Sequence, residues 1–164
     1  MRPDPQVRAQ LVQLQHACMQ PGANAHRADN LHMTLAFLGM VEGRRYETIC
    51  RMASRLRESD FTLRIDHTGY WRRPKILWCA PSQTPQPLAS LVMHLWDGLE
   101  GCGFEPEQRD YRPHVTLLRR AAAVKPQQLK SEIIWKVSHF ELMWSHNKDE
   151  TLHYETLNRW PLQV

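Results

Sequence analysis

Residues 31–39, with the sequence LHMTLAFLG, decide how this chain is interpreted. Side chains along a β-strand point alternately to opposite faces. His32 and Thr34 therefore share one face. Met33 and Leu35 share the other face, which is apolar and predicts a buried side. A face that begins with two polar groups and then becomes apolar is typical of a strand with one end at a cleft.

The same pattern occurs again in the sequence PHVTLL at residues 113–118. His114 and Thr116 stand in the same H-x-T-L order, 82 residues later (114 − 32), which is half of the 164-residue chain. Self-similarity at so long a period indicates two related lobes rather than a solenoid. An approximate twofold axis between such lobes would place the two motif strands side by side, so that both imidazoles face one cleft.

The elements expected around the two motifs support a duplication. Helices are predicted at residues 5–19, 42–59, 87–103 and 125–133, and strands at residues 31–38, 61–71, 75–81, 112–119, 135–146 and 152–162. The second half of the chain begins with a strand that the first half lacks, because the sequence MRPDPQVR opens directly on a helix. We expect one domain over residues 1–164, with a first half of about residues 1–74 and a second half of about residues 75–164.

Composition excludes several classes of protein. The apolar fraction of 42% is that of a globular chain, and no apolar run approaches the length that spans a bilayer. The start of the chain lacks the apolar core of a signal peptide, and four scattered cysteines without a C-x-x-C pair argue against zinc or redox chemistry. We therefore expect a cytoplasmic protein with free thiols. The net charge of +4 permits an anionic partner without requiring one.

Two histidines that face one cleft can carry out acid–base chemistry. Near neutral pH, one imidazole can be neutral and accept a proton while the other is protonated and donates one. The threonine hydroxyls lie about 6–7 Å further along each strand and can donate to the oxygens of a phosphate held between the histidines. Arg119 is a candidate cation, although strict alternation points it away from His114, so a bulge or a strand end would have to re-aim it. Arg112 has the right parity and is expected at the rim.

The stretches HMTLAFLG, YRPHVTLLRR and GYWRRPKILWCAP resemble a known family. The duplicated His-x-Thr motif is similar to that of the 2H phosphoesterases, and the flanking residues resemble the branch of RNA 2′,3′-cyclic phosphodiesterases, also called 2′-5′ RNA ligases. The resemblance covers almost the whole chain. It implies an α+β, bilobal fold with a pseudo-twofold duplication, in which antiparallel sheets flank a central cleft and helices lie outside.

The resemblance also implies a reaction. A 2′,3′-cyclic phosphate at an RNA end or on a nucleoside would be hydrolysed to a 2′-phosphate, with His32 as proton donor to the departing 3′ oxygen and His114 as proton acceptor from water. Thr34, Thr116, Arg119 and Arg112 are the expected substrate-binding residues. No cofactor, metal or membrane is implied, and a monomer is expected. The family usually begins with an apolar strand, so the sheet here is expected to be one strand short and to show an open edge.

Other readings are open at this stage. The same residues would serve the reverse activity, joining RNA ends through a 2′-5′ bond, and a nucleotide- or RNA-binding module could use the histidines to hold phosphate without turnover. A metal hydrolase would need acidic ligands such as Asp29, Asp66 or Asp110, but no H-x-H pair accompanies them. Among the remaining side chains, Trp71 is a candidate for base stacking. His67 and His139 are worth locating because they lie on strands near the junction of the lobes.

Overall fold

The computed structural model describes residues 1–106, 108–148 and 151–163. Its elements follow in the order α1 (Pro5–Ala17), β1 (Asn24–Ala25), the 3₁₀ turn η1 (Ala28–Asn30), α2 (Gly43–Ala53), β2 (Phe61–Trp71), β3 (Ile76–Ala80), α3 (Gln86–Gly101), β4 (Val115–Arg119), β5 (Gln127–Val137), β6 (His139–Lys148) and β7 (Thr151–Pro161). A five-stranded sheet has the order β1-β4-β3-β2-β5, and β6 pairs with β7 in a separate two-stranded sheet. All of these pairings are antiparallel. The expected α+β class is confirmed.

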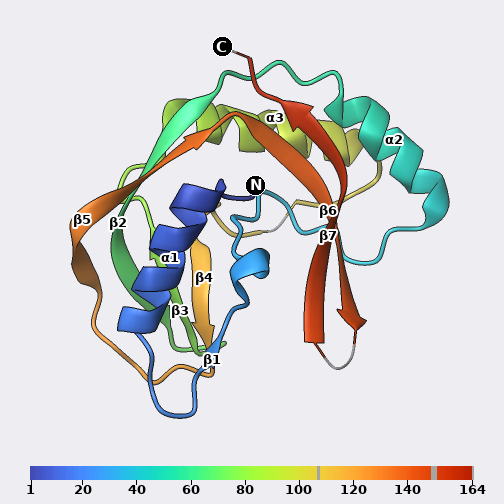
Figure 1. Cartoon of the computed structure of the whole chain (residues 1–164). Helices are drawn as coiled ribbons and strands as arrows, with labels where there is room; N and C mark the ends of the chain where they lie inside the picture. The colour runs from blue at the N-terminus through green and yellow to red at the C-terminus, as the bar shows by residue number, and fades with distance from the viewer. Residues whose placement is uncertain (107, 149–150, 164) are drawn as a thin grey trace.

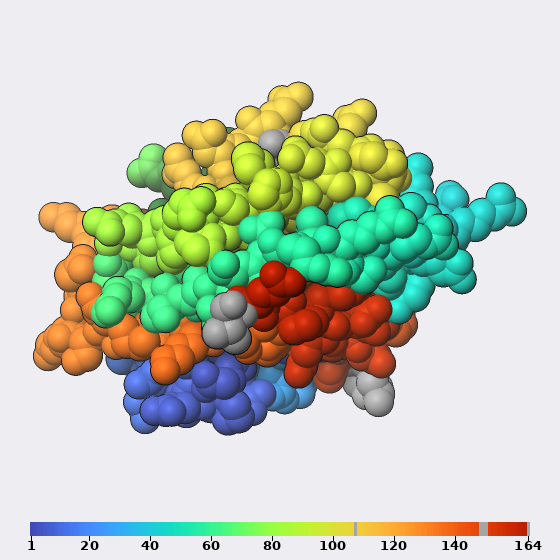
Figure 2. Space-filling view, turned by 90° about the horizontal axis from the view of Figure 1, so that it is seen from above, coloured from blue at the N-terminus to red at the C-terminus, as the bar shows by residue number. Residues whose placement is uncertain are grey.

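Helix α1 lies in front of the five-stranded sheet, α2 and α3 lie together at the top of the view, and β5 continues into the β6–β7 hairpin (Figure 1). Asp4 caps the start of helix α1, because its side chain accepts a hydrogen bond from the backbone N–H of Val7 at 2.9 Å. Its buried residues include Leu11, and α1 packs against β4 and β5. Helix α3 buries an apolar stripe and packs against α2. From above, α3, the segment around α2 and the end of β7 lie in neighbouring bands across one face (Figure 2).

Two expected elements are corrected by the structure. The predicted helix at residues 125–133 is wrong, because residues 127–133 are the first part of β5, which pairs with β2 at Gln127, Gln128 and Ile133. Ile133, Trp135 and Val137 are buried in alternation, which is the strand period, and pairing with a neighbouring strand outweighs the helical propensity of KPQQLKSE. The predicted strand at residues 31–38 is reduced to a single bridge at Met33.

Met1 pairs with the first motif, although we expected an open edge in the lobe that contains the helix at residues 5–19. The N-terminal ammonium group donates to the carbonyl oxygen of Met33 at 2.8 Å, and the Met33 N–H donates to the carbonyl oxygen of Met1 at 3.0 Å. The backbone of Met33 is therefore paired on this side, and the expectation of a sheet that is one strand short stays a prediction. In the described part of the chain, no helix combines the length and the apolar character needed to cross a membrane.

Candidate active site

The two motif segments lie side by side and run antiparallel, joined by a bridge between Met33 and Val115. Both of these side chains are fully buried. Residues directly opposite each other in an antiparallel pair point to one face, and their chain neighbours point to the other. His32 and His114 are such neighbours, so both imidazoles lie on the face that turns away from the core.

Thr34 and Thr116 take the same face, because each lies two residues after its histidine. All four motif side chains are half-buried, and the residues between them are buried. The alternation holds over residues 31–35 and 113–117, although only the second segment is a regular strand. It ends before Phe37, which is 69% exposed where strict alternation predicts a buried side chain. The parity set by the bridge at Met33 and Val115 therefore gives the two histidines and the two threonines the same side of the paired segments.

The two histidines are oriented in the same way by the backbone. The Nδ1 of His32 lies 2.6 Å from the carbonyl oxygen of Asn30, and the Nδ1 of His114 lies 2.9 Å from the carbonyl oxygen of Arg112. A carbonyl oxygen can only accept, so Nδ1 carries the proton in both rings. The Nε2 of each neutral ring then bears the lone pair. Each motif thus presents a nitrogen that accepts a proton when the ring is neutral and donates one when the ring is charged.

His32 lies in the more enclosed environment. Its ring centroid is 4.5 Å from that of Tyr154 and 6.4 Å from that of His26. Burial lowers the pKa of His32 to about 4, although the hydrogen bond to Asn30 opposes the shift. An empty site therefore holds His32 in its neutral form at neutral pH.

His114 lies against an aromatic surface. The ring of Trp71 meets the His114 ring edge-on, with centroids 4.5 Å apart and an interplanar angle of 71°. Trp71 in turn contacts Trp78 at 5.4 Å, and Trp78 contacts His67 at 5.5 Å. These residues line a pocket of about 510 Å³. Trp71 therefore touches a motif histidine, and His67 lies in the same pocket.

A β-bulge places Arg119 on the face of the motif residues. Trp78 pairs with Thr116 and Leu77 pairs with Leu118, so that Leu117 is the extra residue in β4. Both Leu117 and Leu118 are buried, as a bulge would make them. Beyond the bulge the alternation is reversed, and Arg119 returns to the side of Thr116. The bulge therefore supplies the change of direction that Arg119 needs to lie on the side of the motif residues.

The positive charge of Arg119 acts on His26, which lies next to His32. Burial lowers the pKa of His26 to about 4, and the positive charge of Arg119 acts in the same direction. His26 is 8% exposed and lies next to His32. Arg112, by contrast, has an exposed side chain that lines the pocket of His114. Its position matches the rim that the sequence predicts, and its backbone also orients His114.

Three residues that sequence reasoning missed hold the two motifs in place. The Tyr111 hydroxyl donates to the carbonyl oxygen of Thr34 at 3.1 Å. The buried Gln15 side-chain amide donates to the carbonyl oxygens of His26 and Leu117, at 2.8 and 2.7 Å. The Asn30 side chain donates to the carbonyl oxygen of Leu152 at 2.7 Å. A polar residue within an apolar pattern, such as Gln15 in helix α1, is the feature of the sequence that could have indicated these hydrogen bonds.

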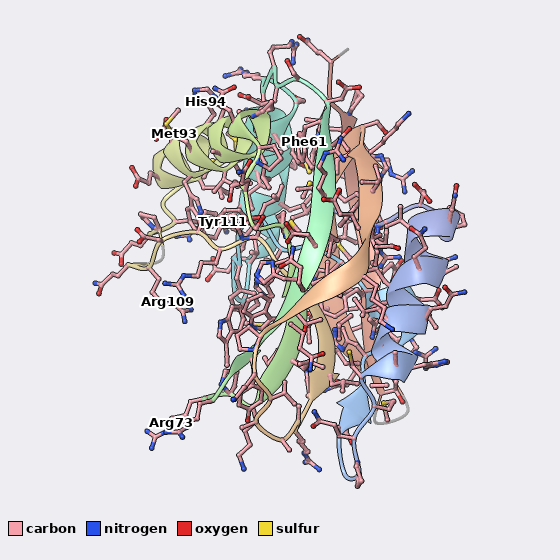
Figure 3. The ribbon with its side chains drawn as sticks, turned by 90° about the vertical axis from the view of Figure 1, so that its left-hand side faces the viewer. Phe61, Arg73, Met93, His94, Arg109 and Tyr111 are labelled. Atoms are coloured by element: carbon pink, nitrogen blue, oxygen red, sulfur yellow. The ribbon has the colours of Figure 1, made fainter. Side chains whose placement is uncertain are left out.

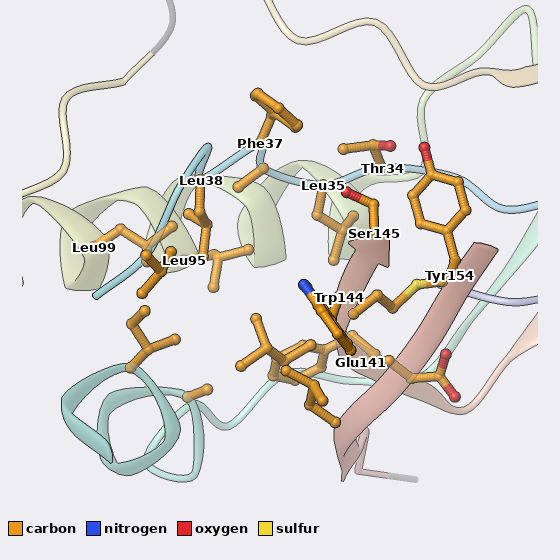
Figure 4. A pocket seen from close by; sticks show the side chains of 18 of the residues that line it. Thr34, Leu35, Phe37, Leu38, Leu95, Leu99, Glu141, Trp144, Ser145 and Tyr154 are labelled. Carbon is orange, nitrogen blue, oxygen red and sulfur yellow. The ribbon is translucent and has the colours of Figure 1, made fainter. Parts of the chain in front are cut away.

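A second pocket, of about 460 Å³, opens beside His32. It is mainly apolar and lies between α2, α3, the segment after the first motif and the β6–β7 hairpin. Figure 4 shows Leu38, Leu95 and Leu99 toward one end of this pocket and Trp144 and Tyr154 toward the other. Thr34 lines it as well. The motif face therefore has an apolar pocket on the His32 side and an aromatic pocket on the His114 side.

Two of the acidic residues weighed as metal ligands, Asp29 and Asp66, are engaged elsewhere. Asp29 pairs with Arg8 at 3.2 Å on the surface, and Asp66 accepts hydrogen bonds from Ser82 and His67. Among residues 1–106, 108–148 and 151–163, no three His, Cys, Asp or Glu side chains are grouped as a metal ion would need. His139 lies 3.6 Å from Glu141 and lines neither of the two pockets.

The fold and the paired motifs define a class, and sequence comparison agrees: the chain belongs to the 2′-5′ RNA ligase superfamily, whose sequence profile matches residues 3–149. The chain is 33% identical over 159 residues to the RNA 2′,3′-cyclic phosphodiesterase of Escherichia coli (strain K12), covering 96% of this chain and 90% of that protein. It is also similar to the crystal structure of E. coli LigT complexed with 3′-AMP, with a TM-score of 0.93 and 30% identity. That match covers 100% of this chain and 95% of LigT. LigT complexed with ATP matches over the same shares, with a TM-score of 0.88 and 30% identity.

Proposed function

We propose that this protein hydrolyses 2′,3′-cyclic phosphate ends of RNA or of nucleosides to 2′-phosphomonoesters, by acid–base catalysis between two histidines and without a metal. One observation carries the proposal. His32 and His114 lie on one face of adjacent antiparallel segments, each with the proton on Nδ1. The relatives add support, because E. coli LigT has been solved with nucleotides.

In this proposal each group has a step, with the roles of the two histidines taken from the resemblance to the family. His114 Nε2 takes a proton from water, whose oxygen attacks phosphorus. The bond from phosphorus to the 3′ oxygen breaks, and His32 Nε2 donates a proton to that oxygen. Acid–base groups of this kind each contribute typically about 10²–10⁴-fold to a rate. Thr34 and Thr116 donate to the non-bridging oxygens, and Arg119 balances the charge that develops on them.

The low pKa of His32 fits an acid that is protonated together with substrate binding. Burial disfavours the cation in the empty site, so His32 is neutral before substrate arrives. A phosphodiester anion beside the ring favours the cation and raises the pKa. The substrate therefore supplies the charge that allows His32 to act as proton donor.

The two-lobed arrangement is part of the same proposal. Residues 1–74 and 75–164 are inferred to be duplicated halves, each of which contributes one motif. Both motifs have the same alternation of burial and the same hydrogen bond from the histidine to the carbonyl oxygen two residues before it. Such local identity at equivalent positions supports a common origin for the two halves.

A turnover assay separates this function from its rivals. The protein is incubated with cytidine 2′,3′-cyclic phosphate in excess EDTA, and the product is followed by chromatography. We expect complete conversion to 2′-CMP over many turnovers. Binding without turnover would instead indicate a nucleotide-binding module, and activity that EDTA abolishes would indicate a metal hydrolase.

A further inference from the structure

Two histidines face each other across the β6–β7 hairpin, and neither of them lines the two pockets. His146 of β6 pairs directly with His153 of β7, next to the pair of Trp144 and Glu155. Alternation along the strands gives these four residues one face of the hairpin, and gives Tyr154, which contacts the first motif, the other face. The histidine pair is therefore separate from the two histidines that the proposed reaction uses.

The two imidazole rings are spaced as a shared metal ion requires. Their centroids lie 5.9 Å apart, and their planes differ by 20°. A metal ion bound to one nitrogen of each ring, with bonds of about 2.0–2.1 Å, sets the ring centroids about 5–6 Å apart. Residues directly opposite each other in an antiparallel pair have Cβ atoms only about 4.5–5.5 Å apart. Backbone pairing thus holds both side chains at a distance from which they can reach one ion.

His146 also has a ring nitrogen that needs a partner. Its Nδ1 is buried and has no hydrogen-bond partner within the part of the chain that the structure describes. Buried polar atoms of folded proteins almost always have a partner, and an unsatisfied one can mark the position of an ion. The exposed carboxylate of Glu155 lies on the same face and adds a negative charge that favours a cation. Imidazole nitrogen is a preferred ligand of copper, nickel and zinc ions.

We propose that His146, through Nδ1, and His153, through one ring nitrogen, bind a divalent metal ion of the class of Cu²⁺, Ni²⁺ or Zn²⁺, with water at its remaining positions. Two protein ligands agree with the finding that no three His, Cys, Asp or Glu side chains are grouped for a metal ion among the described residues. The ion joins β6 to β7 next to Tyr154, and so stabilises the hairpin beside the first motif. Hydrolysis of the cyclic phosphate uses neither ligand.

The test is a titration of the whole protein with NiCl₂, followed by isothermal titration calorimetry and by tryptophan fluorescence. We expect one ion per chain and saturable quenching, because the Trp144 ring stacks on the His146 ring with centroids 4.2 Å apart. His146→Asn and His153→Asn should each weaken binding by about tenfold or more. Trp144→Phe should keep the calorimetric binding but lose most of the quenching. His16→Asn, an exposed change on α1, is the matched control and should bind as wild type does.

Three results would overturn the site. No saturable binding to wild type would contradict it directly, and wild-type affinity in both asparagine variants would indicate an adventitious ion only. Full quenching in Trp144→Phe would place the ion elsewhere. Melting curves give a second readout: Ni²⁺ should raise the melting temperature of wild type relative to EDTA, but not that of a His153→Asn variant that still melts cooperatively. Equal rises in both proteins would also contradict the site.

Discussion

Replacing His26 by glutamine should make the protein less sensitive to acid. Burial and Arg119 lower the pKa of His26 from 6.5 to about 4, so the folded state binds this proton less readily than the unfolded chain does. Stability is then lost as pH falls from about 6.5 toward 4, because the unfolded state takes up the proton first. A shift from 6.5 to about 4 amounts to roughly 3 kcal/mol in full, of which about 2 kcal/mol is lost by pH 5.

The assay is urea unfolding at pH 7.5 and at pH 5, followed by circular dichroism. Wild type should lose about 2 kcal/mol more than His26→Gln over this interval, since glutamine does not titrate. His16→Gln, which changes an exposed histidine, is the control and should follow wild type. Parallel losses in wild type and His26→Gln would refute the reasoning, because they would show that His26 is not held neutral by the fold.

Three further predictions concern the site. Tyr111→Phe removes the hydroxyl that donates to the Thr34 carbonyl oxygen. Urea unfolding should show that the free energy of unfolding falls by about 1 kcal/mol, and kcat should fall as well. Unchanged values of both would mean that this hydrogen bond does not hold the motifs together. Gly69→Ala places a methyl group against the Trp78 indole. This change should lower the free energy of unfolding by about 1–3 kcal/mol and alter the near-UV circular dichroism spectrum. A spectrum and stability like those of wild type would contradict the described packing. The alkaline limb of the kcat/KM profile should begin near pH 4, above which His32 of the free protein, the proposed proton donor, loses its proton. In the kcat profile the limb should move to higher pH because bound phosphate favours the cation, and identical limbs would oppose this.

The parts of the site that follow from local alternation could be predicted from sequence. His32 and Thr34 share a face because of the period of two, and this survives even though their segment forms only one bridge. The position of Arg119 could not be fixed, because it depends on a bulge at Leu117 that is defined by pairing with β3. Sequence periodicity carries no information about which residue of a strand is skipped.

Pairing between strands that are distant in sequence also explains the main error in the predicted secondary structure. Residues 127–132 have helix-forming composition, yet they form part of β5, which pairs with β2 at Gln127 and Gln128 and again from Ile133 to Val137. Tyr111 and Gln15 were not foreseen for a related reason. Their hydrogen bonds reach residues 77 and 102 positions away in sequence, and only the folded chain brings these together. The exposure of Arg73, by contrast, follows from its local sequence. It extends into solvent at the end of the β2–β3 hairpin, as a charged turn residue is expected to do (Figure 3).

The central claim is that two histidines open the cyclic phosphate, with the 3′ oxygen as the leaving atom. The most direct measurement is ³¹P NMR of the product from an oligoribonucleotide with a 2′,3′-cyclic phosphate end, made by wild type, His32→Ala, His114→Ala and the double variant in EDTA. We predict phosphate on the 2′ oxygen with wild type, and turnover lowered by orders of magnitude in each single variant. The double variant should be little worse than either, because the two groups act as a unit. Phosphate on the 3′ oxygen, or wild-type turnover in His114→Ala, would contradict the claim.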